Sequence, residues 1–371
     1  MLVRQIYKFD GTNIPLWVHT LFWGVYVLVF LYSFRMIFFS PRTWKPQKYF
    51  SYLIVSFFTL YAIFYCIGDD YFSYREWIYG RNFEFWNKEN VYIAIVYLCR
   101  ALPISYPYEL FRLIVWGGAV FITYHIFRLY QGLLLPGLTL LLLFAFYSSA
   151  FCYARASLGM AVYFFGVAFY LLQDRKTLKL LGIVIAFLSF FFHHEMIIGI
   201  GLLPCLFIPF ERKNFSFLSI FLLFVAIFAI SFLFSNLQFL DQLFDNDGMS
   251  SKIENFSENG YGVFRLSTLI KYLNYFYPFY LLTRIFWEED TPRSVIGMYR
   301  ITYGILMASV AFMIVFGFRS VFAYRVMYIS MIPTSLMIGY GYCHSYFTRK
   351  QFLIMMTLAL LSSSIRFINS Q

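Results

Sequence analysis

Carboxylates, a histidine pair and isolated arginines interrupt a strongly apolar sequence, and these residue types could do acid–base and phosphate chemistry. Asp69 and Asp70 stand side by side directly after an uncharged apolar run that ends at Gly68. A carboxylate in that place can accept a proton from a hydroxyl group. Two adjacent acids alone are more often the solvated end of a helix, so their neighbours must decide between the two interpretations.

Aromatic side chains crowd the segment that follows the two acids. They are Tyr71, Tyr74, Trp77, Tyr79, Phe83, Phe85 and Trp86. Aromatic residues gather at membrane interfaces, and their rings also stack on sugars. We therefore predict that 71–88 is an amphipathic helix lying on the membrane, that Asp70 is a candidate base, and that Asp69 and Tyr74 are candidate substrate contacts.

Isolated arginines form the second set of candidates. Arg155 lies between two apolar runs, and Arg319 and Arg325 lie in the run GFRSVFAYRVMY. A single arginine at a helix end can extend to lipid head groups. A guanidinium group can also bind two phosphate oxygens at once. Several arginines near one membrane face would suit a diphosphate, whose charge as a leaving group they can stabilise without a metal.

The third set is the triplet His193, His194 and Glu195, which interrupts another apolar stretch. Polar groups in such a place are costly unless they meet water, a partner or a ligand. The spacing is not H-E-x-x-H and no third ligand follows at a suitable distance, so we predict no metal site. We expect His193 to transfer a proton and His194 to contact substrate, and we expect no cofactor.

The composition indicates which kind of molecule must position these residues. Hydrophobic residues make up 61% of the 371 residues and charged residues only 13%, against about 25% charged in a soluble domain. So little charge cannot cover a solvated surface. The five cysteines lack the spacing of a zinc site or a disulfide framework. The formal charge of +11 comes from residues scattered in short loops, which excludes a nucleic-acid partner. The sequence predicts an all-α, polytopic membrane protein with one integral membrane domain over 1–371.

Apolar runs predict about twelve transmembrane helices, since a span needs roughly 20 apolar residues. The candidates are 16–39, 49–67, 108–129, 133–153, 155–172, 178–192, 196–210, 215–235, 267–286, 295–317, 324–343 and 352–369. The pair 178–192 and 196–210 is short, and the last span is weakly apolar. The run 91–102 is too short to span and ends before two prolines, so we read it as interfacial or re-entrant.

Lysine and arginine density assigns the loops to the two sides of the membrane. The denser set includes QDRKTLK, ERKN and HSYFTRKQ and should be cytoplasmic. The other side then receives both termini and the external loops 68–107 and 236–266. It also receives all three candidate sets. We therefore expect acids, histidines and arginines that are distant in sequence to meet at one outer membrane face.

The motifs around these residues resemble a known family. The run from Gly68 to Tyr74 resembles the G-x-D-Y-x-x-Y element of the EpsG-like/Wzy-type polysaccharide (O-antigen) polymerases. YARASLGMAV resembles the R-Q-x-x-A segment of that family, and FFHHEMII resembles its F-H-x-S-A segment. The resemblance matches Asp70, Arg155 and His193 to family positions. Ala156 and Glu195 depart from it, because they stand where glutamine and serine are common.

The resemblance implies a metal-independent glycosyltransferase in a bacterial inner membrane, with a GT-C-like helical arrangement. Its substrates would be undecaprenyl-diphosphate-linked oligosaccharides, joined at the outer face into O antigen, capsule or exopolysaccharide. Its partners would be membrane lipid, a chain-length regulator and a flippase. Two alternatives stay open: a polytopic transporter or flippase of lipid-linked sugars, and another lipid-linked transferase such as a ligase or an acyltransferase. A transporter commonly carries a pseudo-twofold repeat, and the sequence has no visible one.

Overall fold

The computed structural model describes most of the helical parts of the chain. The described residues are 16–39, 71–80, 90–130, 154–208, 276–285, 291–316 and 326–369, with isolated positions 55, 56, 59, 60, 63, 141 and 273. Within these ranges every regular element is a helix and no strand occurs. The all-α class predicted from the composition is therefore confirmed for the described part of the chain.

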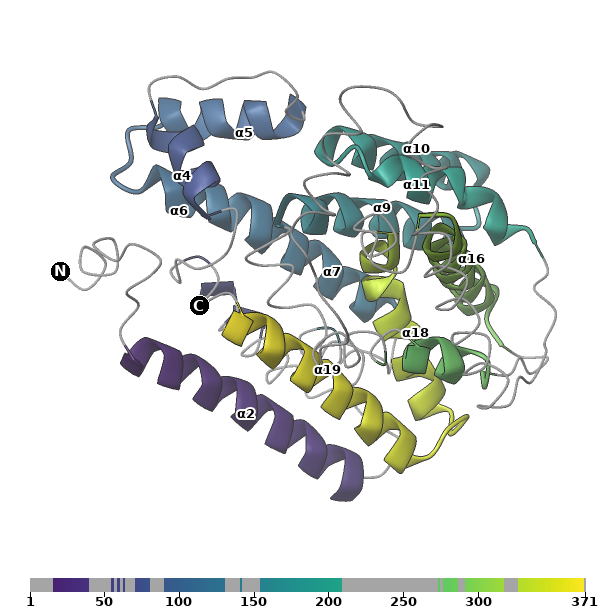
Figure 1. The fold of residues 1–371 in the computed structure, drawn as a ribbon. Helices are drawn as coiled ribbons and strands as arrows, with labels where there is room; N and C mark the ends of the chain where they lie inside the picture. The colour runs from purple at the N-terminus through teal and green to yellow at the C-terminus, as the bar shows by residue number, and fades with distance from the viewer. Residues whose placement is uncertain are drawn as a thin grey trace.

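The N-terminal half supplies a long helix and a group of shorter ones. These are α2 (Leu16–Phe39), α4 (Tyr71–Tyr79), α5 (Asn90–Ala101), and the continuous series α6 (Pro107–Arg112), the π-helical segment η1 (Leu113–Gly117) and α7 (Gly118–Leu129). Pro107 occupies the first turn of α6, where the missing N–H group has no intrahelical partner to lose. In Figure 1, α4, α5 and α6 lie together at one end of the molecule.

The chain from residue 154 onward supplies most of the helices that enclose the core. These are α9 (Ala154–Leu172), α10 (Lys176–Phe192), α11 (Met196–Gly201), the 3-10 helix η3 (Leu203–Leu206), α16 (Arg293–Phe316), α18 (Met331–Cys343) and α19 (Arg349–Asn369). Residues 276–285 add a further helical stretch. α19 packs beside α2, which brings the two ends of the chain's helical part together (Figure 1).

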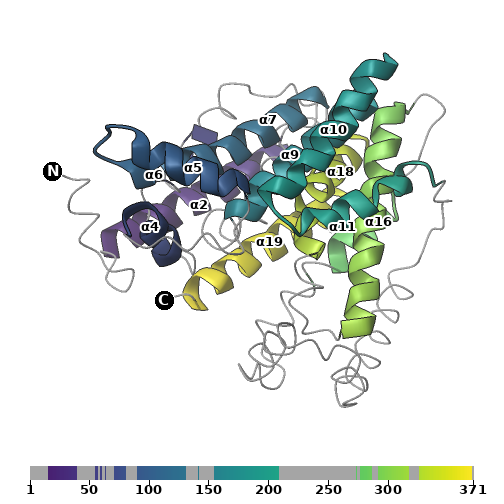
Figure 2. The ribbon, with the colours of Figure 1, turned by 90° about the horizontal axis from the view of Figure 1, so that it is seen from above.

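α9 and α10 form a closely packed antiparallel hairpin, seen side by side in Figure 2. Glycines allow the close approach. A Cβ atom added at Gly166 would lie 2.5 Å from the backbone nitrogen of Ala186 and 2.6 Å from the carbonyl oxygen of Gly182. Because only three residues join the two helices, the end of α10 returns to the beginning of α9. This return places Arg155 and His193 at the same end of the hairpin.

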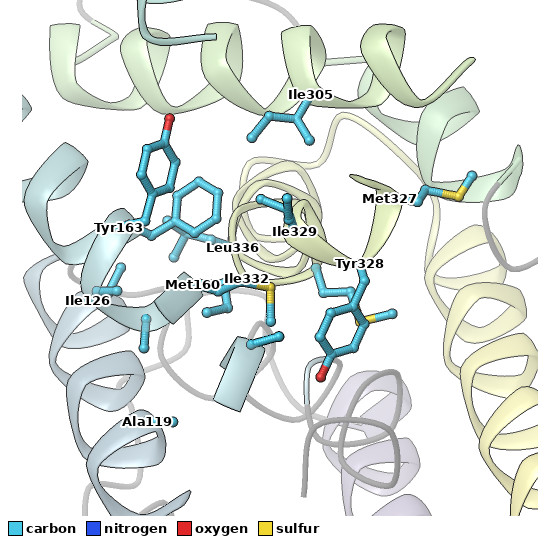
Figure 3. Packing of buried hydrophobic residues seen from close by; sticks show 14 of the residues in the cluster. Ala119, Ile126, Met160, Tyr163, Ile305, Met327, Tyr328, Ile329, Ile332 and Leu336 are labelled. Carbon is cyan, nitrogen blue, oxygen red and sulfur yellow. The ribbon is translucent and has the colours of Figure 1, made fainter. Parts of the chain in front are cut away.

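The hydrophobic core surrounds α18, in which every residue from Met331 to Tyr342 is buried. Figure 3 shows α18 end-on among side chains from three other helices, including Ile126 of α7, Met160 of α9 and Ile305 of α16. Tyr163 and Phe164 are fully buried in the same cluster. The core thus fixes α9, which carries the arginine that the sequence singles out.

Three described helices are long and apolar enough to cross a membrane. They are Pro107–Leu129, Arg155–Leu172 and Arg293–Ala311, which agree closely with the spans predicted at 108–129, 155–172 and 295–317. α2 has the bounds predicted for the first span. The predicted spans 49–67, 133–153 and 215–235 lie wholly or largely outside the described residues, so the total of about twelve spans stays a prediction.

Two sequence predictions differ from the structure. The span predicted at 196–210 is not one helix, because α11 has six residues and is followed by the four-residue 3-10 helix η3. Pro204 lies in the first turn of η3, and proline cannot donate the backbone hydrogen bond that a continuing α-helix requires. The helix predicted at 71–88 ends at Tyr79. Its Tyr74, Trp77 and Ile78 side chains are buried against protein, so α4 is packed in the fold.

Candidate active site

Arg155 lies in the first turn of α9, and α4 packs across it. The Nε–H group of Arg155 donates a hydrogen bond of 3.2 Å to the Tyr74 hydroxyl. Tyr74 is 1% exposed, and its ring also contacts Phe111 of α6 at a centroid distance of 5.5 Å. The sequence predicts Arg155 and Tyr74 as separate candidates, and the structure brings them into direct contact.

Three aromatic rings surround the guanidinium group of Arg155. Its Cζ atom lies 5.0 Å from the ring centroid of Trp77, 5.8 Å from that of Tyr74 and 5.9 Å from that of Tyr92. A cation over an aromatic face gains about 0.5–2 kcal/mol, more where water is excluded. We call Tyr74, Trp77 and Tyr92 with Arg155 the arginine cage. The cage holds a partly buried positive charge at one helix end without a carboxylate among its four members.

α5 also positions the cage. The Tyr92 hydroxyl donates a 2.7 Å hydrogen bond to the backbone carbonyl of Arg155. At the other end of α5, the Nη2 atom of Arg100 donates to the carbonyl of Trp77 and, at 2.9 Å, to the carbonyl of Gly80. Trp77 is in the last turn of α4 and Gly80 directly follows the helix, and a cationic side chain there satisfies these carbonyls and complements the helix dipole. Arg100 therefore fastens α4 over Arg155.

Residues His193, His194 and Glu195, which join α10 to α11 and which we call the histidine turn, pack against the next turn of α9. A Cβ atom added at Gly159 would lie 2.9 Å from the Cβ of His193, so only glycine leaves room for the turn. Residues four apart on a helix have Cβ positions about 5–6 Å apart, and Gly159 follows Arg155 by four. His193 therefore sits one helical turn from the arginine cage.

The His193 ring and the Glu195 carboxylate lie within hydrogen-bonding distance of each other in this turn. The Nε2 atom of His193 lies 3.1 Å from Oε2 of Glu195, and their side chains are 14% and 22% exposed. His194 is exposed and its ring contacts Phe190, with centroids 5.2 Å apart. The two adjacent histidines thus differ: His193 faces α9 and the carboxylate, whereas His194 lies at the surface against α10.

The remaining predicted residues lie outside the described ranges, but their neighbours in sequence can be located. Asp69 and Asp70 immediately precede α4. Arg319 and Arg325 precede the described segment that begins at Val326. In that segment the Tyr328 hydroxyl lies 3.1 Å from Oγ of Ser157, two residues after Arg155.

The polar groups of α5 and α6 near the cage include a buried carboxylate, Glu109, and a buried thiol, Cys99. Neither carboxylate oxygen of Glu109 in α6 has a hydrogen-bond partner within the described residues, although the residue is only 7% exposed. Burial raises the pKa of the Cys99 thiol in the short helix α5 to about 11, which keeps it protonated and unsuited to nucleophilic attack. Among the residues that the structure describes, no three His, Cys, Asp or Glu side chains are grouped as metal ligands would be.

The sequence did not predict which residues would hold Arg155, although it singled out Tyr74 for another role. Tyr92 is 63 positions from Arg155 and Tyr74 is 81 positions away, and a tyrosine in an apolar helix has no distinctive signal. Arg100 is visible in the sequence as a lone cation in an apolar run, but its role as the cap of α4 is not. Glu195 is visible in the sequence as part of the polar triplet and as a departure from the pattern F-H-x-S-A, but its contact with His193 is not.

A comparison with protein-family models matches residues 47–370 to the model described as the EpsG family. The matched region includes α4, α5, α9 and the histidine turn, and therefore the whole of the site. A comparison with curated proteins gives no match, and a comparison with solved structures gives none.

Proposed function

The chain belongs to the EpsG family, and on this premise we propose that it is a glycosyltransferase that joins undecaprenyl-diphosphate-linked oligosaccharide repeat units. The family and the apolar helices indicate a polysaccharide polymerase-like membrane protein. The finer proposal is that the product is O antigen, capsule or exopolysaccharide. The reaction would take place at the outer face of a bacterial inner membrane.

One observation carries this proposal: the arginine cage lies one helical turn from His193. A glycosyl transfer from a lipid diphosphate needs a cation at the leaving group and a proton acceptor at the attacking hydroxyl. Arg155 in the first turn of α9 offers the first, and the histidine turn, which packs against the next turn of α9 at Gly159, offers the second. The Tyr74 and Trp77 rings hold the guanidinium group in place, so its donors are preorganised for phosphate oxygens.

In the proposed reaction, Arg155 holds the donor diphosphate and stabilises its charge as the bond to the anomeric carbon breaks. Arg319 or Arg325 would add a second cation, which the position of Tyr328 beside Ser157 supports. His194 and Asp69 would contact the sugars, whereas Tyr74, predicted from the sequence as a substrate contact, is 1% exposed and would act by holding the Arg155 guanidinium group. Two groups could take the proton of the acceptor hydroxyl. Asp70 is the first candidate, since a carboxylate at a wet surface is ionised near neutral pH; His193 is the second.

The proposed substrates imply how lipid tails reach the site and which partners the protein contacts. The lipid tails of donor and acceptor would enter sideways between apolar helices of a single integral membrane unit with a GT-C-like arrangement. We expect contact with membrane lipid and association with a chain-length regulator and a flippase, and no nucleic-acid partner. The reaction as proposed needs no metal and no cofactor.

A deletion strain tests the class of function. Loss of a polymerase leaves surface material of single repeat units without long chains. Complete polymer retained on the undecaprenyl carrier would instead identify a ligase, and repeat units trapped at the cytoplasmic leaflet would identify a flippase. Either of these last two outcomes refutes the proposal.

Substitution of Arg155 by lysine tests the role of the cage. Lysine keeps the charge but loses the planar pair of donors, so the polymerisation rate should fall by about 100-fold or more. Arg175→Lys is the matched control, because Arg175 is exposed at the opposite end of the hairpin and should stay within twofold of wild type. Fluorescence-detected size exclusion establishes that both variants fold. A wild-type rate for folded Arg155→Lys contradicts the assignment.

A further inference from the structure

The His193–Glu195 pair has a geometry that suggests more than an isolated surface contact. The 3.1 Å separation joins Nε2 of the imidazole to one carboxylate oxygen, and both side chains are largely removed from water. In such surroundings the field of a carboxylate is screened less than at an exposed surface. The carboxylate is therefore able to influence the protonation and orientation of the ring.

The backbone holds both members of the pair in place. The N–H group of His193 donates to the Ser189 carbonyl at the end of α10, and the His193 carbonyl accepts from the Met196 N–H at 2.9 Å. The Glu195 carbonyl accepts from the Ile198 N–H at 3.1 Å as α11 begins. The Cβ of His193 is pressed against Gly159. The turn is thus anchored to α9, α10 and α11 together.

α11 is fastened to α9 by a second contact. The Tyr163 hydroxyl donates a 2.5 Å hydrogen bond to the Gly199 carbonyl. Tyr163 is one turn beyond Gly159, which is one turn beyond Arg155. The arginine cage, the histidine turn and the anchor of α11 therefore lie in order along one face of α9, and this order fixes the direction from which Glu195 approaches His193.

We propose that Glu195 is a positioning residue that makes His193 the proton acceptor of the glycosyl transfer. This inference rests on the proposed function. His193 takes the proton of the acceptor hydroxyl as its oxygen forms a bond to the anomeric carbon of the donor. The bond from that carbon to the diphosphate breaks, and its electron pair passes to the diphosphate oxygen beside Arg155. Glu195 stabilises the imidazolium ion that results, and the proton then passes to water.

The arrangement follows the general logic of a base that a carboxylate orients and stabilises. It also gives a reason for the acid at position 195, where the resembling segment commonly has serine. An acid in an apolar stretch is costly. Its negative charge can stabilise a histidine that becomes cationic, which a serine hydroxyl cannot do. Among the described residues of α5, α9, α10 and α11, the other charged groups are Arg155 on α9, Arg100 on α5, and Lys176 and Lys179 at the far end of α10; His194 is adjacent to the pair.

Four variants test the inference: Glu195→Gln, Glu195→Asp, His193→Asn and the double variant His193→Asn/Glu195→Gln. The substrate is the undecaprenyl-diphosphate-linked repeat unit extracted from a strain that lacks this gene, and the rate of chain extension is followed on gels. Glutamine keeps the size of Glu195 and removes its charge. We expect Glu195→Gln to lower the rate about 10-fold or more and His193→Asn to lower it about 10²- to 10⁴-fold.

The double variant distinguishes positioning from a structural role. If Glu195 acts through His193, Glu195→Gln has no further effect once His193 is asparagine. Glu195→Asp, which retains the charge, should recover part of the rate. Asp174→Asn is the matched control, because Asp174 is exposed at the far end of the hairpin, and its rate should equal that of wild type. All rates are normalised to folded protein, and Glu195→Ser replaces Glu195→Gln if the latter does not accumulate.

The outcomes separate this inference from the proposed function. Wild-type activity of Glu195→Gln, or equal losses from Glu195→Gln with and without His193, overturns the inference. If His193→Asn has no measurable activity, the inference stands only if Glu195→Asp is faster than Glu195→Gln. Polymerisation that requires Arg155 and not Glu195 leaves the proposed function in place. Full activity of both Arg155→Lys and His193→Asn overturns the proposed function as well.

Discussion

The substitution Gly159→Ala tests whether the spacing between the histidine turn and α9 matters for activity. The added Cβ would lie 2.9 Å from the Cβ of His193, 3.3 Å from Cγ of Met196 and 3.5 Å from the His193 backbone nitrogen. The Met196 side chain can rotate away. The Cβ of His193 cannot, because it is bonded directly to the backbone, so the turn itself must move.

The displacement is small but sufficient to affect catalysis. Ordinary contacts between such atoms begin near 3.4 Å, so His193 must retreat by about 0.5 Å, and a misplacement of about 1 Å can lower a rate about 100-fold. If the logarithm of the rate falls in proportion to the displacement, a displacement of half that size lowers the rate about 10-fold. Overpacking costs about 1–3 kcal/mol of stability, whereas replacing glycine by alanine within a helix returns about 1 kcal/mol. The variant should therefore fold.

The measurement is the rate of chain extension per folded molecule, with thermal unfolding in detergent measured in parallel. Gly118→Ala is the control, because its Cβ would meet only the end of the Leu158 side chain, at 3.5 Å. We expect the Gly159 variant to lose about 10-fold in rate with a nearly unchanged melting temperature, and the Gly118 variant to lose neither. A folded Gly159 variant with the wild-type rate would refute the argument that His193 must sit at its observed distance from α9.

Three further substitutions test the supports of the site. Arg100→Gln removes the charged cap of α4 and should destabilise that helix by about 1.5–3 kcal/mol, seen as faster hydrogen exchange at 71–80 and a reduced rate. Glu109→Leu removes a buried carboxyl group whose oxygens have no hydrogen-bond partner among the described residues, and should stabilise the protein by about 1–3 kcal/mol in thermal unfolding. Gly166→Ala would meet backbone atoms of α10 at 2.5 and 2.6 Å and should reduce the yield of folded protein, whereas Gly201→Ala, with nothing within 4 Å, should not.

Much of the helical framework could be predicted because a bilayer imposes strict rules on sequence. A helix that spans it must be long and apolar, and its polar residues must lie at its ends. The bounds of α2 and α9 follow directly from this rule. The rule fails at 196–210, where apolar composition is present but Pro204 prevents a continuous helix. The prediction of a helix over 71–88 was wrong in length, because α4 ends at Tyr79; Tyr74 and Trp77 pack into the protein, and Tyr79 is exposed.

The site could be predicted only in part, for a related reason. The sequence places Arg155 and His193 at one membrane face, because a short turn must return α10 alongside α9. It cannot say which aromatic residues surround Arg155, since packing between helices depends on rotations that composition does not determine. The contacts of Tyr92 and Trp77 with the guanidinium group therefore needed the structure. The contact between Glu195 and His193 also needed the structure, because residues that are close in sequence do not always have side chains in contact.

The lengths of the hairpin helices explain why the reactive groups gather where they do. α9 has 19 residues and α10 has 17, so at 1.5 Å per residue each is about 25–29 Å long, close to the roughly 30 Å thickness of the hydrocarbon core. A charge between the ends of such helices would face lipid or core, and the few charges available are therefore restricted to the ends. A substrate with a lipid tail and a charged diphosphate has its own boundary between apolar and polar parts at the same depth. The bond that would be broken thus lies at the depth of the helix ends, where the free-energy cost of placing the Arg155 and His193 side chains is lowest.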